Sequence, residues 1–323
     1  MRSIAITKGH RLSTILNAVL PLFGLILLGY VSGRRQLLGP GAVDNLNNFV
    51  VWLALPALLF QAMAQITWEQ ANQPGFVLTT GLAMAAVFGT SYVLGRNPQR
   101  RLADASIDGL AASYSNSGYM GIPLCIMVLG QDSLPATVVS VLLTACGLFA
   151  FSIVLVEIDL QSSPNILRTA RKVLQSLLRN PLVTAPLLGA VFAAMQIPLP
   201  GPLLQLTTLL GEAASPCALV TIGLFLAQSQ TGGELKAVRR IVVLKLFLHP
   251  LITFVLVRWV FDMPALWGNT AILLSALPVG TGPFMLAKLY DRQPAVTSRA
   301  ILLSTLLSVF TVSVLVAFSN GGA

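Results

Sequence analysis

The sequence predicts an all-α integral membrane protein with ten transmembrane helices, arranged as two inverted five-helix repeats. Three observations predict this fold. The chain is 55% hydrophobic and only 10% charged, with a mean hydropathy of +0.80, which places it outside the soluble globular class. Apolar stretches of about 18 to 25 residues, each long enough to cross a bilayer, recur along its 323 residues. Helix-breaking residues recur at matched positions of the two halves.

Ten apolar segments are predicted to span the membrane. They cover residues 14–32, 42–63, 76–95, 105–130, 134–157, 181–197, 203–227, 240–262, 267–290 and 296–318. The first segment follows three basic residues, as in a signal peptide, but it is too long for a typical signal sequence. It also ends at Gly33-Arg34-Arg35 rather than at a small-residue cleavage site. We therefore interpret it as a retained span.

Basic residues predict the orientation in the membrane. All but four of the 20 Lys and Arg residues lie in the loops after spans one, three, five, seven and nine or in the flanking helix ends. The positive-inside rule then places both termini outside the cytoplasm. The net charge of +9 is interpreted as this topology signal and not as a nucleic-acid-binding patch. Cys125, Cys146 and Cys217 lie in apolar segments without metal-ligand spacing, so no metal or cofactor is expected.

Prolines and glycines repeat at an offset of 160 residues. The matched pairs are Pro21 and Pro181, Pro40 and Pro200, Pro56 and Pro216, Pro123 and Pro283, Gly29 and Gly189, and Gly41 and Gly201. This offset covers five spans, and because five is odd the two halves must enter the membrane from opposite sides. Residues 1–160 and 161–323 are thus predicted to be inverted repeats, an arrangement typical of secondary transporters.

Spans four and nine are predicted to break in the middle of the membrane. Span four contains "SNSGYMGIP", residues 115–123, and span nine contains "SALPVGTGP", residues 275–283. Irregular backbone at this depth is tolerated only against protein or a wet cavity. Proline suits the first turn of a helix, so Pro123 and Pro283 are predicted to begin two half-helices, and Gly121 and Gly282 to let a ligand approach the backbone. Two helix N-termini at one site favour an anion such as a carboxylate.

The segments "SNSGYMGIPL" and "ALPVGTGPFMLAKLYD" resemble the crossover segments of the auxin efflux carrier family. The resemblance implies a fold like that of bile-acid symporters and sodium/proton antiporters. It further implies a scaffold of spans one, two, six and seven, a transport unit of spans three to five and eight to ten that moves in elevator fashion, and a homodimer formed through the scaffold. It assigns the substrate carboxylate to Asn116. Plant members also carry an asparagine in the second crossover, which this chain lacks. That difference argues against auxin, and the resemblance to bacterial members implies a carrier in a bacterial inner membrane for an organic acid such as malate or malonate.

The predicted function is an efflux carrier or permease for a small organic anion, with the lipid bilayer as its other partner. The predicted binding residues are Ser115, Asn116, Ser117, Gly121, Pro123, Gly280, Thr281, Gly282 and Pro283. An anion channel is one alternative, because crossed half-helices can also line a pore. A sodium-coupled uptake carrier like the bile-acid symporters is another, although span nine has no acid between Ala271 and Lys288 to hold sodium.

Glu212 and His249 are the candidate proton-coupling groups. Glu212 lies near the middle of span seven, where an ionisable residue is costly and therefore a functional candidate; the alternative is a carboxylate that lines a wet crevice. His249 lies in span eight, one turn from Lys245, and could relay a proton or bind substrate; the alternative is a histidine held by a neighbouring carbonyl. A contact between Glu212 and His249 is a hypothesis. Lys288 is expected to extend to the cytoplasmic surface, with attraction of the anion as the alternative.

An enzyme is not expected. Two histidines, His10 and His249, are too few for a histidine-based metal site, and no G-x-S-x-G segment supports a serine nucleophile. Tyr290-Asp291 resembles half of an intramembrane aspartyl protease motif, but no second acid lies in the required glycine-rich context.

Overall fold

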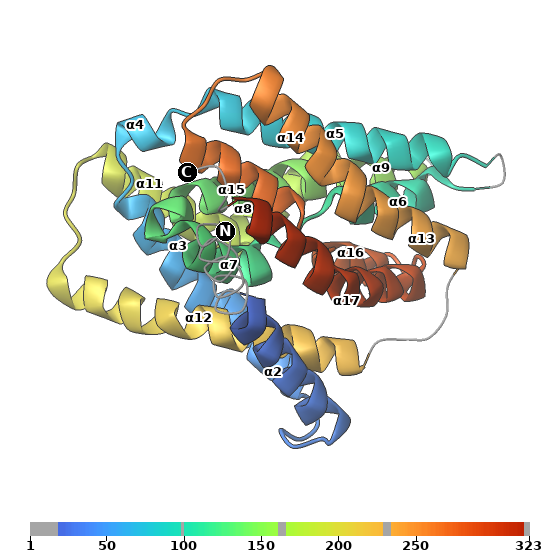
Figure 1. The fold of residues 1–323 in the computed structure, drawn as a ribbon, viewed down its shortest axis with the longest axis horizontal. Helices are drawn as coiled ribbons and strands as arrows, with labels where there is room; N and C mark the ends of the chain where they lie inside the picture. Colours follow the sequence, from blue (N-terminus) through green and yellow to red (C-terminus); the bar gives the residue numbers. More distant parts are fainter. Residues whose placement is uncertain (1–18, 98–99, 161–165, 229–233, 320–323) are drawn as a thin grey trace, which may run out of the picture.

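A computed structural model describes residues 19–97, 100–160, 166–228 and 234–319 (Figure 1). Within these ranges every regular element is a helix, and the one β-type pairing is an isolated antiparallel bridge between Ser115 and Val279. The predicted all-α class is therefore confirmed for the described part of the chain. The first five residues of the expected first span lie outside the described residues.

Six helices in the described ranges are long and apolar enough to cross a membrane. They are Ala42–Ala64 (α2, Ala42–Phe49, and α3, Leu55–Ala64), Trp68–Leu94 (α4, Trp68–Ala71, and α5, Pro74–Leu94), Gln131–Leu160 (α8, Leu134–Leu142, and α9, Phe149–Leu160), Gly201–Ala227 (α12), Leu235–Trp259 (α13, Leu235–Val243, and α14, His249–Trp259) and Pro294–Ala317, within α17 (Pro294–Ser319). π-Helical turns join α2 to α3, α8 to α9 and α13 to α14. The chain is therefore an integral membrane protein.

The other expected spans appear as shorter helices. They are Val19–Arg34, α6 (Leu102–Ser113), Ser117–Leu129 (a π-helical turn followed by α7, Ile122–Leu129), α11 (Pro181–Ala194), α15 (Ala265–Ser275) and α16 (Gly282–Leu289). α10 (Ile166–Arg179) precedes α11, and the two helices are bent by 72° at their junction. If this bent pair is one span, seven helices in the described part can cross a membrane. Expected spans four and nine are each divided into two short helices.

The helices form two groups that lie side by side. The flank group consists of Val19–Arg34, α2, α3, α11 and α12, seen as the blue and yellow helices at the left and bottom of Figure 1. The crossover group consists of α5 to α9 and α13 to α17, which occupy the centre and right. Contact between the groups runs through α3 against α8 and through α12 against the π-helical turn that precedes α7. The first break segment therefore sits at the boundary of the two groups.

Two glycine contacts in the flank group recur 160 residues apart. A Cβ atom on Gly29 would lie 2.2 Å from the carbonyl oxygen of Val220, and a Cβ on Gly189 would lie 2.3 Å from that of Phe60. The first contact brings Val19–Arg34 against α12, and the second brings α11 against α3. Only glycine permits helix backbones to approach this closely. Gly29 and Gly189, matched in the sequence, therefore have the same packing role.

Charged residues hold one end of the crossover group together. The carboxylate of Asp108 on α6 accepts hydrogen bonds from Arg100 and from Arg240 on α13, each at 2.5 Å. Asp104, one turn earlier on α6, pairs with Arg292 through two hydrogen bonds of 2.9 and 2.6 Å. Asp108 is 1% exposed. The pairs join α6, α13 and the α16–α17 connection, so these elements are held as one body.

Candidate functional site

The two helix breaks pair with each other. The Asn116 N–H donates to the carbonyl oxygen of Pro278 at 3.0 Å, and the Gly280 N–H donates to that of Tyr114 at 3.1 Å. A further bond, from the Val279 N–H to the hydroxyl of Ser304, anchors the second break on α17 at 3.1 Å. Backbone at the breaks thus finds its partners in protein, as the hydrocarbon interior of a membrane requires.

The half-helix after the first break does not begin where proline predicted. Helix resumes at Ser117 with a π-helical turn, in which the N–H groups of Met120 and Gly121 both donate to Asn116 O. Pro123 lies in the first turn of α7, behind that π-helical turn, so the prediction that Pro123 begins the half-helix is wrong. The prediction for the second break is confirmed, because α16 begins at Gly282 with Pro283 in its first turn.

The extra turn changes how the two breaks correspond. In these two hydrogen bonds the donors, Asn116 and Gly280, correspond to each other, and so do the acceptors, Tyr114 and Pro278. Corresponding residues are therefore 164 positions apart, and not 160. Pro123 and Pro283 are therefore matched in sequence number but occupy different places in their half-helices. The π-helical turn before Pro123 has no counterpart before Pro283.

The glycines of the breaks pack closely against side chains. A Cβ on Gly282 would lie 2.6 Å from Cζ of Tyr114, and one on Gly280 would lie 2.9 Å from Cδ1 of the same ring. A Cβ on Gly121 would lie 2.7 Å from a methyl group of Leu274. Gly121 and Gly282 thus have a packing role, and the expectation that they let a ligand approach the backbone stays a prediction. Sequence reasoning missed Tyr114, because its ring contacts glycines that lie far along the chain.

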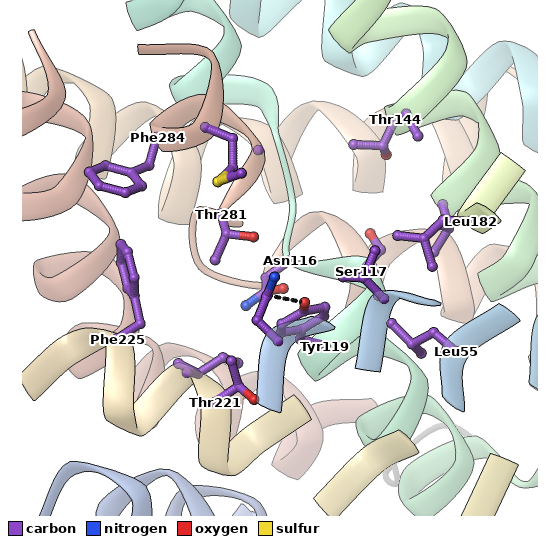
Figure 2. Close-up of a pocket in the computed structure, with 18 of the residues that line it drawn as sticks. Leu55, Asn116, Ser117, Tyr119, Thr144, Leu182, Thr221, Phe225, Thr281 and Phe284 are labelled. Atoms are coloured by element: carbon purple, nitrogen blue, oxygen red, sulfur yellow. Dashed lines mark hydrogen bonds between the residues drawn. The ribbon is translucent and has the colours of Figure 1, made fainter. Parts of the chain in front are cut away.

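A cavity of about 450 Å³ opens over the paired breaks, between the two helix groups (Figure 2). Five predicted residues line this first cavity: Ser115, Asn116, Ser117, Thr281 and Gly282. The other four, Gly121, Pro123, Gly280 and Pro283, are not among its lining residues. Pockets of about 300 to 1,000 Å³ are usual for small-molecule ligands, so the first cavity is large enough for an organic acid.

Two helix N-termini border the first cavity. Ser117 and Gly118 belong to the first turn after one break, and Gly282 and Phe284 to the first turn of α16. The first N–H groups of a helix have no partner inside the helix and carry partial positive charge. The hydroxyls of Ser115 and Ser117 are buried without a hydrogen-bond partner in the described structure. The wall beside Asn116 therefore presents polar groups that a bound anion can use.

The rest of the lining combines polar and aromatic side chains. The Tyr119 hydroxyl donates to Asn47 Oδ1 at 2.6 Å, which joins the first break to α2. The rings of Phe225 and Phe284 meet edge to face with centroids 5.0 Å apart, and Figure 2 shows them on one side of the cavity, with Asn116 and Tyr119 at its centre. Among the described lining residues, Lys288 is the one basic side chain and Asp44 the one acidic side chain. Lys288 thus lines the cavity, and its side chain is exposed.

Glu212 and His249 do not share a site. Glu212 is exposed and lines a second cavity of about 580 Å³, together with Gln61, Gln131 and Asp132. His249 is 2% exposed and lines a separate small cavity near α15. Glu212 therefore lines a crevice, as the alternative interpretation expected, and its role in proton coupling stays a prediction. In the described part of the chain, no three His, Cys, Asp or Glu side chains gather as a metal site requires.

Broken helices that meet at a cavity inside an apolar helical protein are typical of membrane transporters. Comparison with known proteins agrees: residues 14–316 match the model of the family described as "Membrane transport protein", and the chain belongs to this family. A Rhizobium meliloti protein described as "Putative malonate transporter" is 31% identical over 97% of this chain and 98% of its own length. "Auxin efflux carrier component 8" of Arabidopsis thaliana is 22% identical over 92% of this chain and 95% of its own. The resemblance to auxin efflux carriers is thereby confirmed.

Proposed function

We propose that this protein is a permease that carries a small organic anion across the membrane by alternating access, and that it is not an enzyme. The observation that carries the proposal is the meeting of two helix N-termini, at Ser117 and Gly282, on one cavity beside Asn116. Such N-termini stabilise a carboxylate without a full positive charge in the membrane. Ser115, Ser117 and Thr281 are then the hydroxyls that orient the carboxylate.

A short dicarboxylate is the substrate class that the site suits best. Each of its two carboxylates can approach one of the two helix N-termini, and Lys288 adds a positive charge at the same cavity. The Rhizobium meliloti relative is described as a malonate transporter, so malonate is the first substrate to test. Phe225 and Phe284 supply an apolar wall beside the hydrocarbon part of the acid.

The two large cavities favour a carrier over a channel. Both follow α3, α12 and the helix from Ser117 to Leu129, but they have no lining residue in common. On α12 the first cavity uses Thr221 to Phe225 and the second uses Thr208 to Ser215. Ala218 on α12 and Leu124 on α7, which lie between these stretches, are fully buried. A closed barrier between two access paths is what alternating access requires.

The inverted repeat is part of the proposal. In it, residues 1–160 and 161–323 form two five-span halves, the flank group is the scaffold, and the crossover group moves past it as the transport unit. The contacts of Gly29 with Val220 and of Gly189 with Phe60 support this division, because they relate the two halves by the same offset of 160. The paired hydrogen bonds between the breaks support a two-fold relationship at the site itself.

The orientation follows from the basic residues. With both termini outside the cytoplasm of a bacterial inner membrane, the first cavity opens toward the cytoplasm and the second toward the outside. The paired arginines around Asp108 and Asp104 then lie at the cytoplasmic end of the transport unit. A homodimer through the flank group is the assembly implied by the family resemblance.

Counterflow in proteoliposomes tests the proposed function. Vesicles loaded with unlabelled acid are mixed with labelled malonate, malate, succinate, a monocarboxylate or indole-3-acetate. We expect saturable exchange of one dicarboxylate, abolished by Asn116→Ala and retained by Asn72→Ala, a matched change at an exposed site outside the cavity. Flux that does not saturate would identify a channel. Folded protein that exchanges none of the acids would contradict the anion proposal.

A further inference from the structure

A lysine is buried completely at the C-terminal end of α15, the first half of the second broken helix. Lys245 lies in the π-helical turn between α13 and α14 and is 0% exposed. Its Nζ donates to the carbonyl oxygen of Ser275, the last residue of α15, at 2.5 Å, and lies 3.1 Å from Nδ1 of His249. An amine in this position is costly to bury unless it is matched by other groups, so its partners indicate its role.

No carboxylate of the neighbouring helices is free to pair with Lys245. The helices packed against this π-helical turn are α5, α6, α13, α14 and α17. The acids of α6 are Asp104, held by Arg292, and Asp108, held by Arg100 and Arg240. The described residues of α5, α13, α14 and α17 include no Asp or Glu; their charged side chains are Lys236, Arg239, Arg240, Arg258 and Arg299. The partner of the ammonium is therefore the negative end of the α15 dipole.

His249 and Lys245 together can hold no more than one positive charge. Two cations at 3.1 Å with no anion between them would repel strongly at this depth. An ammonium that donates both to Ser275 O and to Nδ1 of a neutral imidazole satisfies both contacts. The pair then behaves as one cation placed at the end of α15.

The pair is connected to the candidate binding site through Ser115. A cavity of about 10 Å³ lies against His249, Ser275, Ser115 and Thr80. The hydroxyls of Ser115 and Thr80 are buried and have no partner in the described structure. Ser115 also lines the first cavity. The charge on the pair therefore lies one residue away from the proposed anion.

We propose that the amine of Lys245 is a tethered cation: a covalently attached positive charge that takes the place of a free cation at the end of α15. Anion transport would then be independent of sodium. In ion-coupled carriers, carbonyl groups at the ends of broken helices bind a free cation. Here the amine of Lys245 already occupies such a carbonyl, at Ser275, so a free cation cannot use this carbonyl. The inference about substrate coupling rests on the proposed function, whereas the occupation of the α15 end by Lys245 does not.

Thermal unfolding of purified protein tests the tethered cation without any transported substrate. The wild type and Lys245→Ala are melted in choline, sodium or methylammonium chloride at equal ionic strength. We expect one unfolding temperature for the wild type in all three salts. We expect a lower temperature for Lys245→Ala in choline and a selective recovery in methylammonium, which can replace the lost amine. Lys236→Ala, an exposed change on α13, is the matched control and should resemble the wild type.

A sodium-specific stabilisation of the wild type would overturn the proposal, and so would a Lys245→Ala protein that unfolds like the wild type in choline. Lys245→Gln covers the case in which the alanine variant does not fold, because glutamine keeps a donor for Ser275 O without the charge. The expected result for Lys245→Gln is a lower unfolding temperature in choline; wild-type stability would show that the charge is unnecessary.

Exchange assays then test the consequence for transport. Wild-type exchange should be equal in sodium and in choline, and Lys245→Gln should lose about ten-fold in rate, the size of one favourable charge–helix-end interaction in a buried setting. Sodium-dependent wild-type exchange, or full activity of Lys245→Gln, would overturn the inference. If the wild type exchanges no acid at all, the proposed function fails, while the unfolding experiment still decides the role of Lys245.

Discussion

The backbone N–H of Asn116 donates to the carbonyl oxygen of Pro278, so one broken helix supplies the hydrogen-bond partner that the other lacks. The same residue contributes its side chain to the first cavity. Asn116 therefore has two separable roles: its backbone closes the crossover, and its amide faces the proposed substrate. Substitutions can separate these roles because alanine keeps the backbone N–H and proline removes it.

We predict that Asn116→Ala abolishes exchange without changing the unfolding temperature by more than a degree or two, since both backbone hydrogen bonds remain. Asn116→Pro should lower the unfolding temperature as well, because a buried carbonyl at Pro278 loses its donor, at a cost of about 1 to 3 kcal/mol. Unfolding curves and counterflow on the same preparations give both readouts. A large loss of stability in Asn116→Ala would show that the side chain holds the fold and does not simply bind the substrate.

Gly282 is predicted to tolerate no side chain while Tyr114 is present. Gly282→Ala places a methyl group 2.6 Å from the tyrosine ring, and overpacking of this kind costs about 1 to 3 kcal/mol. Tyr114→Leu combined with Gly282→Ala should recover part of that loss, which a double-mutant cycle of unfolding free energies measures. Gly81→Ala is the control, because a Cβ at this helical position meets nothing within 4 Å. If the changes in unfolding free energy of the two single variants simply add in the double variant, the contact between residues 114 and 282 is contradicted.

The pattern of the sequence predicted the helical class, the breaks and their pairing, but not the finer geometry of the site. Apolar length and dense Gly and Pro locate spans and breaks because these residues act locally. The start of the half-helix at Ser117 depends on a π-helical turn, which has no local sequence signal. Tyr114 was missed because its role depends on glycines far along the chain. Both interpretations of Glu212 stayed open because membrane depth alone does not reveal a neighbouring cavity.

The repeated glycine contacts are predicted to be equally sensitive in the two halves. Gly29→Ala and Gly189→Ala each press a methyl group against a backbone carbonyl oxygen, at 2.2 and 2.3 Å. The added methyl group can be accommodated only if the two packed helices move apart. Each change should therefore destabilise the protein by about 1 to 3 kcal/mol. Gly24→Ala on the first helix meets nothing within 4 Å and is the control. Loss of stability in only one half would contradict an equivalent packing role.

Asp108 is predicted to stabilise the crossover group more than any exposed acid does. Asp108→Asn leaves Arg100 and Arg240 facing each other without their shared carboxylate, and loss of one partner in a buried pair costs about 3 to 5 kcal/mol. Glu69→Gln, at an exposed site, should change the unfolding free energy by no more than about 0.5 kcal/mol. Unfolding in detergent across a salt series measures both. An Asp108→Asn protein as stable as the wild type would show that the arginines find other partners.

Lys288 is predicted to attract the anion to the first cavity and not to set the rate of its passage. The side chain is exposed at the cavity, so its attraction acts through water and weakens as salt screens it. Lys288→Gln should raise the KM for the exchanged acid several-fold at low ionic strength, leave the maximal rate unchanged, and lose most of this difference in high salt. Lys236→Gln, exposed on α13 and outside the cavity, should leave KM unchanged. A lower maximal rate with unchanged KM would instead place Lys288 in the conformational step, because a charge that only recruits the anion acts before the carrier moves.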